Sequence, residues 1–152
     1  MRLEKRSPCK VNLLLNILGK RADGFHELET VMQPVNFCDE LAFARGGHGV
    51  QLSCSDVSLP VDARNLVFRA AANFLTAAKI SDGVKIHLEK KIPLAAGLGG
   101  GSGDAATTLL ALNELFDRPL SGALEGQFIA HVHRLHDGFE FVKAVGPFAE
   151  DV

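Results

Sequence analysis

The chain has 152 residues, of which 47% are hydrophobic and 22% are charged. This length fits one ordinary domain or one lobe of a larger protein, and the apolar fraction is enough to build a core, so composition argues against disorder. The formal net charge is −2, without the basic excess that a duplex-binding domain normally shows. A nucleic acid is therefore not expected as a partner.

The cysteines and the amino terminus indicate the cellular compartment. The chain has three cysteines, Cys9, Cys38 and Cys54. An odd number without a Cys-x-x-Cys pair argues against a disulfide framework or a zinc ribbon and suits a reducing compartment. The apolar run at 11–18 contains two asparagines and is followed by no Ala-x-Ala cleavage site, and no stretch approaches the roughly 20 apolar residues of a membrane helix. We expect a soluble, cytoplasmic protein without a membrane partner.

The first half of the chain is predicted to be mostly extended. Residues 9–18 form a short apolar run that predicts a buried strand. A turn follows at 19–24, and further strands are predicted over 26–35, 40–44 and 50–54. Residues 62–79 change to a helical period, with Asp62 or Asn65 as the N-cap.

The second half alternates strand, loop and helix. Residues 84–89 alternate apolar and polar side chains and predict a half-exposed strand. Residues 93–103 hold five glycines and are predicted to be loop. From Ser102 to Phe116, Ala105, Leu109 and Leu112 share one face of a predicted helix, and a further helix is predicted over 122–136. This order of elements indicates an α+β fold.

Residues 93–103, the glycine-rich segment, are the strongest chemical signal. They read Pro93, Leu94, Ala95, Ala96, Gly97, Leu98, Gly99, Gly100, Gly101, Ser102 and Gly103. Glycines allow consecutive backbone N–H groups to turn toward one point, and the first turn of the following helix adds further donors and the positive end of its dipole. The segment therefore predicts a phosphate site that needs no basic side chain. The Ser102 hydroxyl is the candidate ligand for Mg²⁺ or a phosphate oxygen.

Other glycine-rich motifs fit less well. A Walker A loop needs a lysine where Ser102 stands. The Rossmann pattern is matched loosely by Gly101-Ser-Gly-Asp-Ala-Ala106, but the predicted strand ends about a dozen residues earlier and no acidic residue closes a later strand. The remaining alternative is a flexible connector, although connectors rarely run straight into a capped amphipathic helix.

Two motifs resemble a known family. Gly97-Leu-Gly-Gly-Gly-Ser-Gly-Asp-Ala-Ala106, with Pro93, resembles the phosphate-binding motif of the GHMP kinases. Ser7-Pro-Cys-Lys10-Val-Asn12-Leu-Leu-Leu, followed by Arg21-Ala-Asp-Gly-Phe25-His26-Glu, resembles those members that phosphorylate a hydroxyl of CDP-methylerythritol in non-mevalonate isoprenoid synthesis. The resemblance covers residues 1 to about 120. It implies ATP and Mg²⁺ as cofactors, CDP-methylerythritol as the substrate, and an α+β amino-terminal lobe with a mixed sheet backed by helices.

The resemblance also implies roles for single residues. Lys10 matches an active-site lysine beside the attacking hydroxyl, where an ammonium favours the developing alkoxide, and Asn12 lies by the substrate on the same strand face. Phe25 and His26 match a Tyr-His pair that grips cytosine, one by stacking and one by hydrogen bonding. Taken alone, Lys10 would be a solvated lysine and Phe25 a core residue. The chain departs from the family at Phe25, where Tyr is usual, and at Gly103, where Ser is more frequent.

The resemblance ends near residue 120. The family carries its catalytic aspartate in a Gly-[Ser/Ala]-Asp-Val-Pro motif that this sequence lacks. Asp137 lies at about the right distance to be the base that takes the hydroxyl proton; the alternative is a turn residue that ends a helix. We expect residues 1–120 to form the ATP-binding domain and 121–152 a divergent or truncated tail, with the second lobe missing. The alternative function is a catalytically inactive fragment that binds only nucleotide or a partner.

Overall fold

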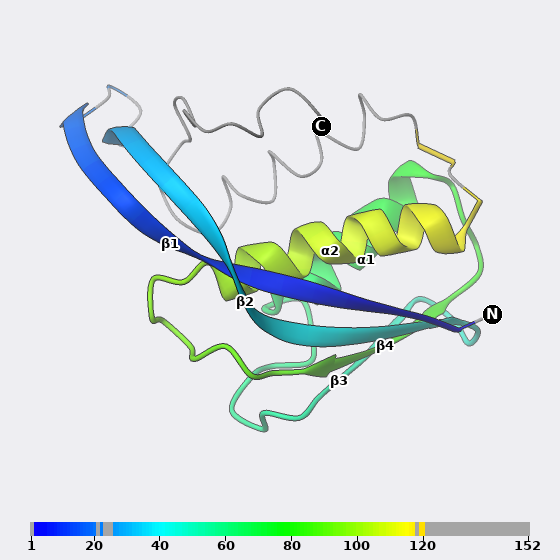
Figure 1. The fold of residues 1–152 in the computed structure, drawn as a ribbon. Helices are drawn as coiled ribbons and strands as arrows, with labels where there is room; N and C mark the ends of the chain where they lie inside the picture. Colours follow the sequence, from blue (N-terminus) through cyan, green and yellow to red (C-terminus); the bar gives the residue numbers. More distant parts are fainter. Residues whose placement is uncertain (1, 21, 23–25, 118, 121–152) are drawn as a thin grey trace.

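The computed structural model describes residues 2–20, 22, 26–117 and 119–120. Its elements are β1 (Arg2–Lys20), β2 (His26–Arg45), β3 (Val50–Cys54), α1 (Leu66–Ala77), β4 (Val84–Glu89) and α2 (Gly100–Leu115). The strands form one sheet in the order β1-β2-β4-β3, in which β3 and β4 are parallel and the other pairs antiparallel. Both helices lie on one side of this mixed sheet (Figure 1), which confirms the α+β prediction.

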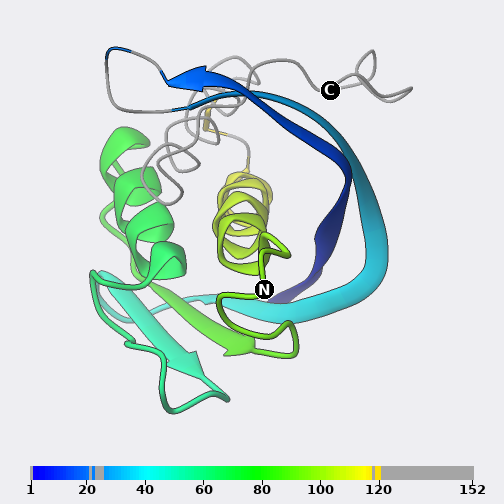
Figure 2. The same cartoon turned by 90° about the vertical axis from the view of Figure 1, so that its left-hand side faces the viewer.

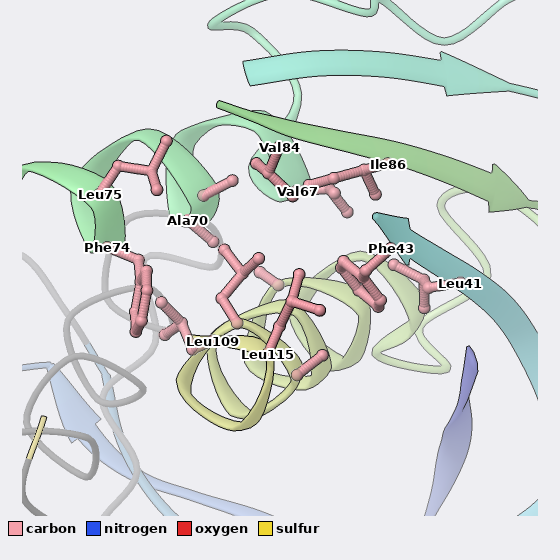
Figure 3. Close-up of a cluster of buried hydrophobic side chains, with 14 of the residues drawn as sticks. Leu41, Phe43, Val67, Ala70, Phe74, Leu75, Val84, Ile86, Leu109 and Leu115 are labelled. Carbon is pink, nitrogen blue, oxygen red and sulfur yellow. The ribbon is translucent and has the colours of Figure 1, made fainter. Parts of the chain in front are cut away.

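The hydrophobic core lies between the sheet and the two helices, as Figure 3 shows. Helix α1 buries one face and begins after Asn65, whose side chain accepts a hydrogen bond from the Val67 N–H at 2.9 Å. The structure thus selects Asn65 over Asp62 as the N-cap. Helix α2 is buried on most sides, because the long β1–β2 ribbon curves around it (Figure 2).

Two expectations about the whole chain can be compared with the described residues. All three cysteines are free, in agreement with the absence of a disulfide framework. Within the described ranges, no helix is both long and apolar enough to cross a membrane.

Strand β1 differs from its prediction. It runs beyond 9–18 at both ends, and its outer half is not buried: Leu13, Ile17 and Leu18 are exposed by 66%, 64% and 59%. Among the described residues this half pairs with β2 alone, and it extends beyond the helices (Figure 1). An apolar run was therefore a sound signal for a strand and a wrong one for burial.

Strand β2 replaces two predicted strands. The predictions over 26–35 and 40–44 fall in one continuous strand, His26–Arg45. Its register against β1 shifts where Pro8 pairs with Cys38 and Cys9 pairs with Val35, so residues 36–37 are extra on the β2 side. The interruption in the sequence pattern is a β-bulge, which bends the strand without ending it.

The glycine-rich segment was predicted to be loop throughout, but helix α2 begins at Gly100. Glycine is a poor helix former, and here close packing explains it. A Cβ on Gly100 would lie 3.0 Å from the Ile92 side chain, and a Cβ on Gly103 would lie 3.1 Å from Ser7 Oγ. These glycines let the helix approach the sheet closely.

Candidate functional site

The segment between β4 and α2 leaves the core and returns to it. Ile92 is buried, whereas Pro93 to Gly97 are exposed. The backbone has positive φ angles of 55° at Ala95 and 72° at Gly97 and Gly99. Glycine adopts this left-handed region without penalty, but a residue with a Cβ does not. The path of the segment therefore depends on glycine at positions 97 and 99.

Helix α2 opens without a side-chain cap. Its N-cap is Gly99, which has no side chain to accept hydrogen bonds. The first intrahelical bond runs from the Gly103 N–H to the Gly99 carbonyl at 2.9 Å, so the N–H groups of Gly100 and Gly101 precede the hydrogen-bonded turns. Such donors, with the positive end of the helix dipole, form a natural anion site.

Lys10 contacts the glycine-rich segment directly. Its ammonium donates to the Gly97 carbonyl at 2.8 Å, although 87 positions separate the two residues. Its backbone N–H donates to the Leu98 carbonyl at 3.0 Å. The lysine stem also covers Gly99, where an added Cβ would lie 3.1 Å from Lys10 Cε. The two motifs identified separately in the sequence therefore meet in one place.

The other predicted site residues are distributed unevenly. The Asn12 side chain accepts a hydrogen bond from the Lys10 ammonium at 3.3 Å, which puts these two side chains together as expected. Ser102 belongs to the first turn of α2 and is only 4% exposed. His26 opens β2 opposite Lys20, at the outer end of the ribbon. Phe25 and Asp137 lie outside the described residues.

A buried ion cluster, formed by Asp39, Lys90 and Asp104, lies below the glycine-rich segment. The Lys90 ammonium pairs with Asp39 Oδ2 and, at 3.1 Å, with Asp104 Oδ2. The three side chains are exposed by no more than 5%. Asp39 Oδ1 also accepts the backbone N–H groups of Lys91 and Ile92 at 2.6 and 2.8 Å. The cluster thus joins β2, the end of β4 and the start of α2.

The electrostatics of this cluster are unbalanced, because two carboxylates share one ammonium. Burial raises the pKa of Asp104 to about 6, and the charge of Asp39 adds to the rise while Lys90 opposes it. Burial also works against the charge of Lys90, but its hydrogen bond to Asp39 and the charge of Asp104 outweigh this and raise the pKa of Lys90. The buried Ser7 hydroxyl of the neighbouring strand lies close enough to Asp104 to oppose this rise as well.

The sequence analysis did not identify this cluster. One sign was present in the pattern: Asp39 lies two and four positions before Leu41 and Phe43, so alternation puts it on the apolar face of β2. Asp104 likewise falls on the buried face of α2, four positions before Thr108. Charged residues at core positions are almost always paired, so Asp39 and Asp104 are expected to have partners. No feature of the neighbouring sequence identifies Lys90 as that partner.

The chain is similar to a family of small-molecule kinases. The family model described as the GHMP kinases N terminal domain matches residues 65–138. Over 110 residues, or 72% of this chain, the sequence is 54% identical to the 4-diphosphocytidyl-2-C-methyl-D-erythritol kinase of Syntrophus aciditrophicus (strain SB), and the match covers 39% of that enzyme. Across eight of the curated relatives that it matches, the chain spans between 38% and 42% of their length.

Solved structures show the same relationship. A crystal structure of 4-(cytidine 5'-diphospho)-2C-methyl-D-erythritol kinase superposes with a TM-score of 0.71 and 41% sequence identity, covering 86% of this chain and 47% of that one. A homoserine kinase from Cytophaga hutchinsonii ATCC 33406 superposes with a TM-score of 0.67 at 23% identity, covering 88% of this chain and 41% of that one. At that identity, the second match shows a shared fold alone.

Proposed function

We propose, for a chain that belongs to the GHMP kinase family, that the glycine-rich segment binds the phosphates of ATP and that the whole enzyme phosphorylates a hydroxyl of 4-diphosphocytidyl-2-C-methyl-D-erythritol. The observation that carries the proposal is the contact of Lys10 with the Gly97 carbonyl at 2.8 Å. It joins the candidate catalytic lysine to the candidate phosphate site. Because the chain spans about two fifths of its relatives, the kinase activity belongs to the whole enzyme, and nucleotide binding is proposed for residues 1–120.

Phosphate binding would use backbone donors. The amides at the start of α2 and the helix dipole favour negative charge at this point. Exposed residues 93–97 leave the approach from solvent open. The Lys10 ammonium lies at the edge of the same segment. No acidic residue stands in the first turn of α2 to oppose an anion there.

The transfer step needs positioning more than covalent chemistry. The substrate oxygen forms a bond to the γ-phosphorus, the bond from that phosphorus to the bridging oxygen breaks, ADP leaves, and the hydroxyl proton passes to a base. An ammonium has three N–H donors, and Lys10 directs two of them at Gly97 and Asn12. The third can donate to the reacting oxygen and stabilise its developing charge. We propose Asp137 as the base that takes the proton.

Magnesium and cytosine recognition complete the proposal. Mg²⁺ neutralises phosphate charge when it is bound, and it usually takes one or two protein ligands besides phosphates and water; Ser102 is the proposed protein ligand. A fall in MgATP affinity on Ser102→Ala, with unchanged binding of ATP in EDTA, tests that role.

Phe25 and His26 are proposed to hold the cytosine ring. His26 of β2 pairs with Lys20, which lies about ten residues along β1 from Lys10, roughly 33 Å of extended strand. The ribbon curves back toward the helices (Figure 2).

The test compares two glycines in the 152-residue chain by calorimetric titration with MgATP. Gly97→Ala adds no contact within 4 Å but places a Cβ at a φ of +72°, whereas Gly19→Ala adds a Cβ in open space at an ordinary φ. A left-handed alanine costs about 1–2 kcal/mol, so the segment should shift and the affinity fall roughly tenfold. Gly19→Ala should bind like the natural chain. Equal affinity for all three proteins would remove the segment from phosphate binding.

A chimera tests the kinase activity. Residues 1–120 of this chain would replace the matching part of the Syntrophus aciditrophicus relative, and ADP release would be followed with 4-diphosphocytidyl-2-C-methyl-D-erythritol and MgATP. We expect turnover that depends on this substrate. A folded chimera that binds ATP but does not use the substrate would contradict the proposed specificity.

A further inference from the structure

We propose that the buried ion cluster of Asp39, Lys90 and Asp104 is a positioning device that fixes the glycine-rich segment in the shape that receives nucleotide phosphates. The inference rests on the proposed function for its consequence, since a fixed segment matters only if it binds phosphate. The three side chains of the cluster are almost fully buried, so the role inferred for them is positioning and not ligand contact.

The cluster holds both ends of the segment. At the entry, Asp39 accepts the backbone N–H groups of Lys91 and Ile92, the two residues that precede Pro93. At the exit, Asp104 follows Gly103 and pairs with the Lys90 ammonium at 3.1 Å. Since Lys90 also pairs with Asp39, the segment leaves and returns through a single set of polar contacts.

The Lys90 ammonium lies next to the first turn of α2, whose backbone N–H groups are the proposed phosphate donors. A Cβ on Gly100, the first residue of α2, would lie 3.0 Å from Lys90 Nζ. Any shift of the ammonium therefore changes the space available to the first turn of the helix. For the same reason a side chain at Gly100 would disturb the cluster as well as the phosphate site, which makes Gly97 the cleaner test of phosphate binding.

The composition of the cluster argues for more than stability. Burying charges is costly, and apolar side chains of similar volume often stabilise a core as well or better. What three charges provide, and apolar packing would not, is directional contacts between β2, β4 and α2. We infer that these directional contacts hold the backbone donors of the phosphate site in place.

Two substitutions at Asp104 separate position from charge. Asparagine keeps an oxygen that can accept from Lys90 and offers an N–H₂ group that can donate to Ser7 Oγ, so it retains the connection without the charge. Alanine removes the connection, yet it is a good helix former and takes away a costly buried carboxylate. A control at the other end of α2 is Asn113→Ala, which removes the two hydrogen bonds between Asn113 and Leu120 far from the segment.

The experiment is hydrogen exchange of the full 152-residue chain, read by mass spectrometry on peptides that cover residues 93–101, with calorimetric MgATP titration and thermal unfolding of the same proteins. We expect Asp104→Ala to speed exchange in these peptides at least tenfold and to weaken MgATP binding by a similar factor, with an unfolding temperature close to that of the natural chain. Asp104→Asn should stay within about twofold on both measures. Asn113→Ala should lower the unfolding temperature and leave both unchanged.

The outcomes separate this inference from the proposed function. Unchanged exchange of residues 93–101 in Asp104→Ala overturns the inference whether or not nucleotide binds. Equal effects of alanine and asparagine also overturn it, because the charge and not the connection would then be the cause. If the natural chain binds no MgATP but Asp104→Ala still speeds exchange, the positioning role holds and the proposed nucleotide binding fails.

Discussion

Replacing Asp104 with asparagine should change how the stability of this chain depends on pH. Burial raises the pKa of the Asp104 carboxyl from 3.8 to about 6. A carboxyl whose pKa is higher in the folded state contributes its full stability below the unfolded value, and that contribution is lost as the pH rises through about 6. Two pKa units correspond to about 3 kcal/mol. Because pH 4 lies just above the unfolded pKa, part of this contribution is already lost there. The free energy of unfolding of Asp104→Asn, relative to the natural chain, should therefore rise by about 2 kcal/mol between pH 4 and pH 7.

Urea unfolding at several pH values measures this difference. The chain has no Trp and no Tyr, so helix circular dichroism is the suitable signal. Loss of the charged partner of Lys90 changes the free energy of unfolding by an amount that does not depend on pH. Only the pH dependence of the difference between the two proteins reports on the titration of Asp104. Asp62→Asn is the control, because hydrogen bonds from Arg64 lower the pKa of the exposed Asp62 to about 2, so its contribution is lost only in strong acid. A flat difference for Asp104→Asn from pH 4 to pH 7 would refute the reasoning.

Three further predictions concern the proposed activity. In the chimera, Lys10→Ala should lower kcat about a hundredfold or more and leave the KM for ATP nearly unchanged; an effect confined to that KM would remove Lys10 from the chemistry. Phe25→Ala should weaken substrate binding by about 1–3 kcal/mol by analogy with base stacking, and Phe25→Tyr should be nearly neutral; an unchanged substrate KM for alanine would make the ring a packing residue. The 152 residues alone should bind MgATP without measurable turnover, and ADP release near 1 s⁻¹, within the usual range for kinases, would contradict that division of the site.

Local sequence signals were sufficient for much of the fold. The period of α1 and the alternation of β4 depend on neighbours within one or two turns of chain, so the sequence predicts them. The N-cap of α1 was narrowed to Asp62 or Asn65, and the structure selects Asn65. The exposure of the outer half of β1 and the bulge in β2 depend on what lies across the sheet. An apolar run such as Leu13 to Leu18 has the same sequence whether or not a helix covers it. The burial of its side chains therefore could not be predicted.

The candidate site divides in the same way. Lys10 and the glycine-rich segment were each identified by motif, and only the fold shows that they touch. The buried ion cluster could not be assembled from sequence, because Asp39 lies 51 positions from Lys90 and each residue alone would be expected at the surface. Three charges that pair only in three dimensions leave no local pattern.

The way the strands hold the glycine-rich segment follows from the chemistry of its donors. A phosphate site made of backbone N–H groups has no flexible side chain to follow the ligand, so its affinity depends on donors that are already in place. Each contributing strand holds a different point: β1 through the Lys10 N–H and the Leu98 carbonyl, β2 through Asp39, and β4 through Lys90. Gly103 belongs to the same arrangement, because a side chain there would start 3.1 Å from Ser7 Oγ and 3.4 Å from the Pro8 carbonyl. The absence of a hydroxyl at position 103 thus accompanies a close approach of β1 to α2.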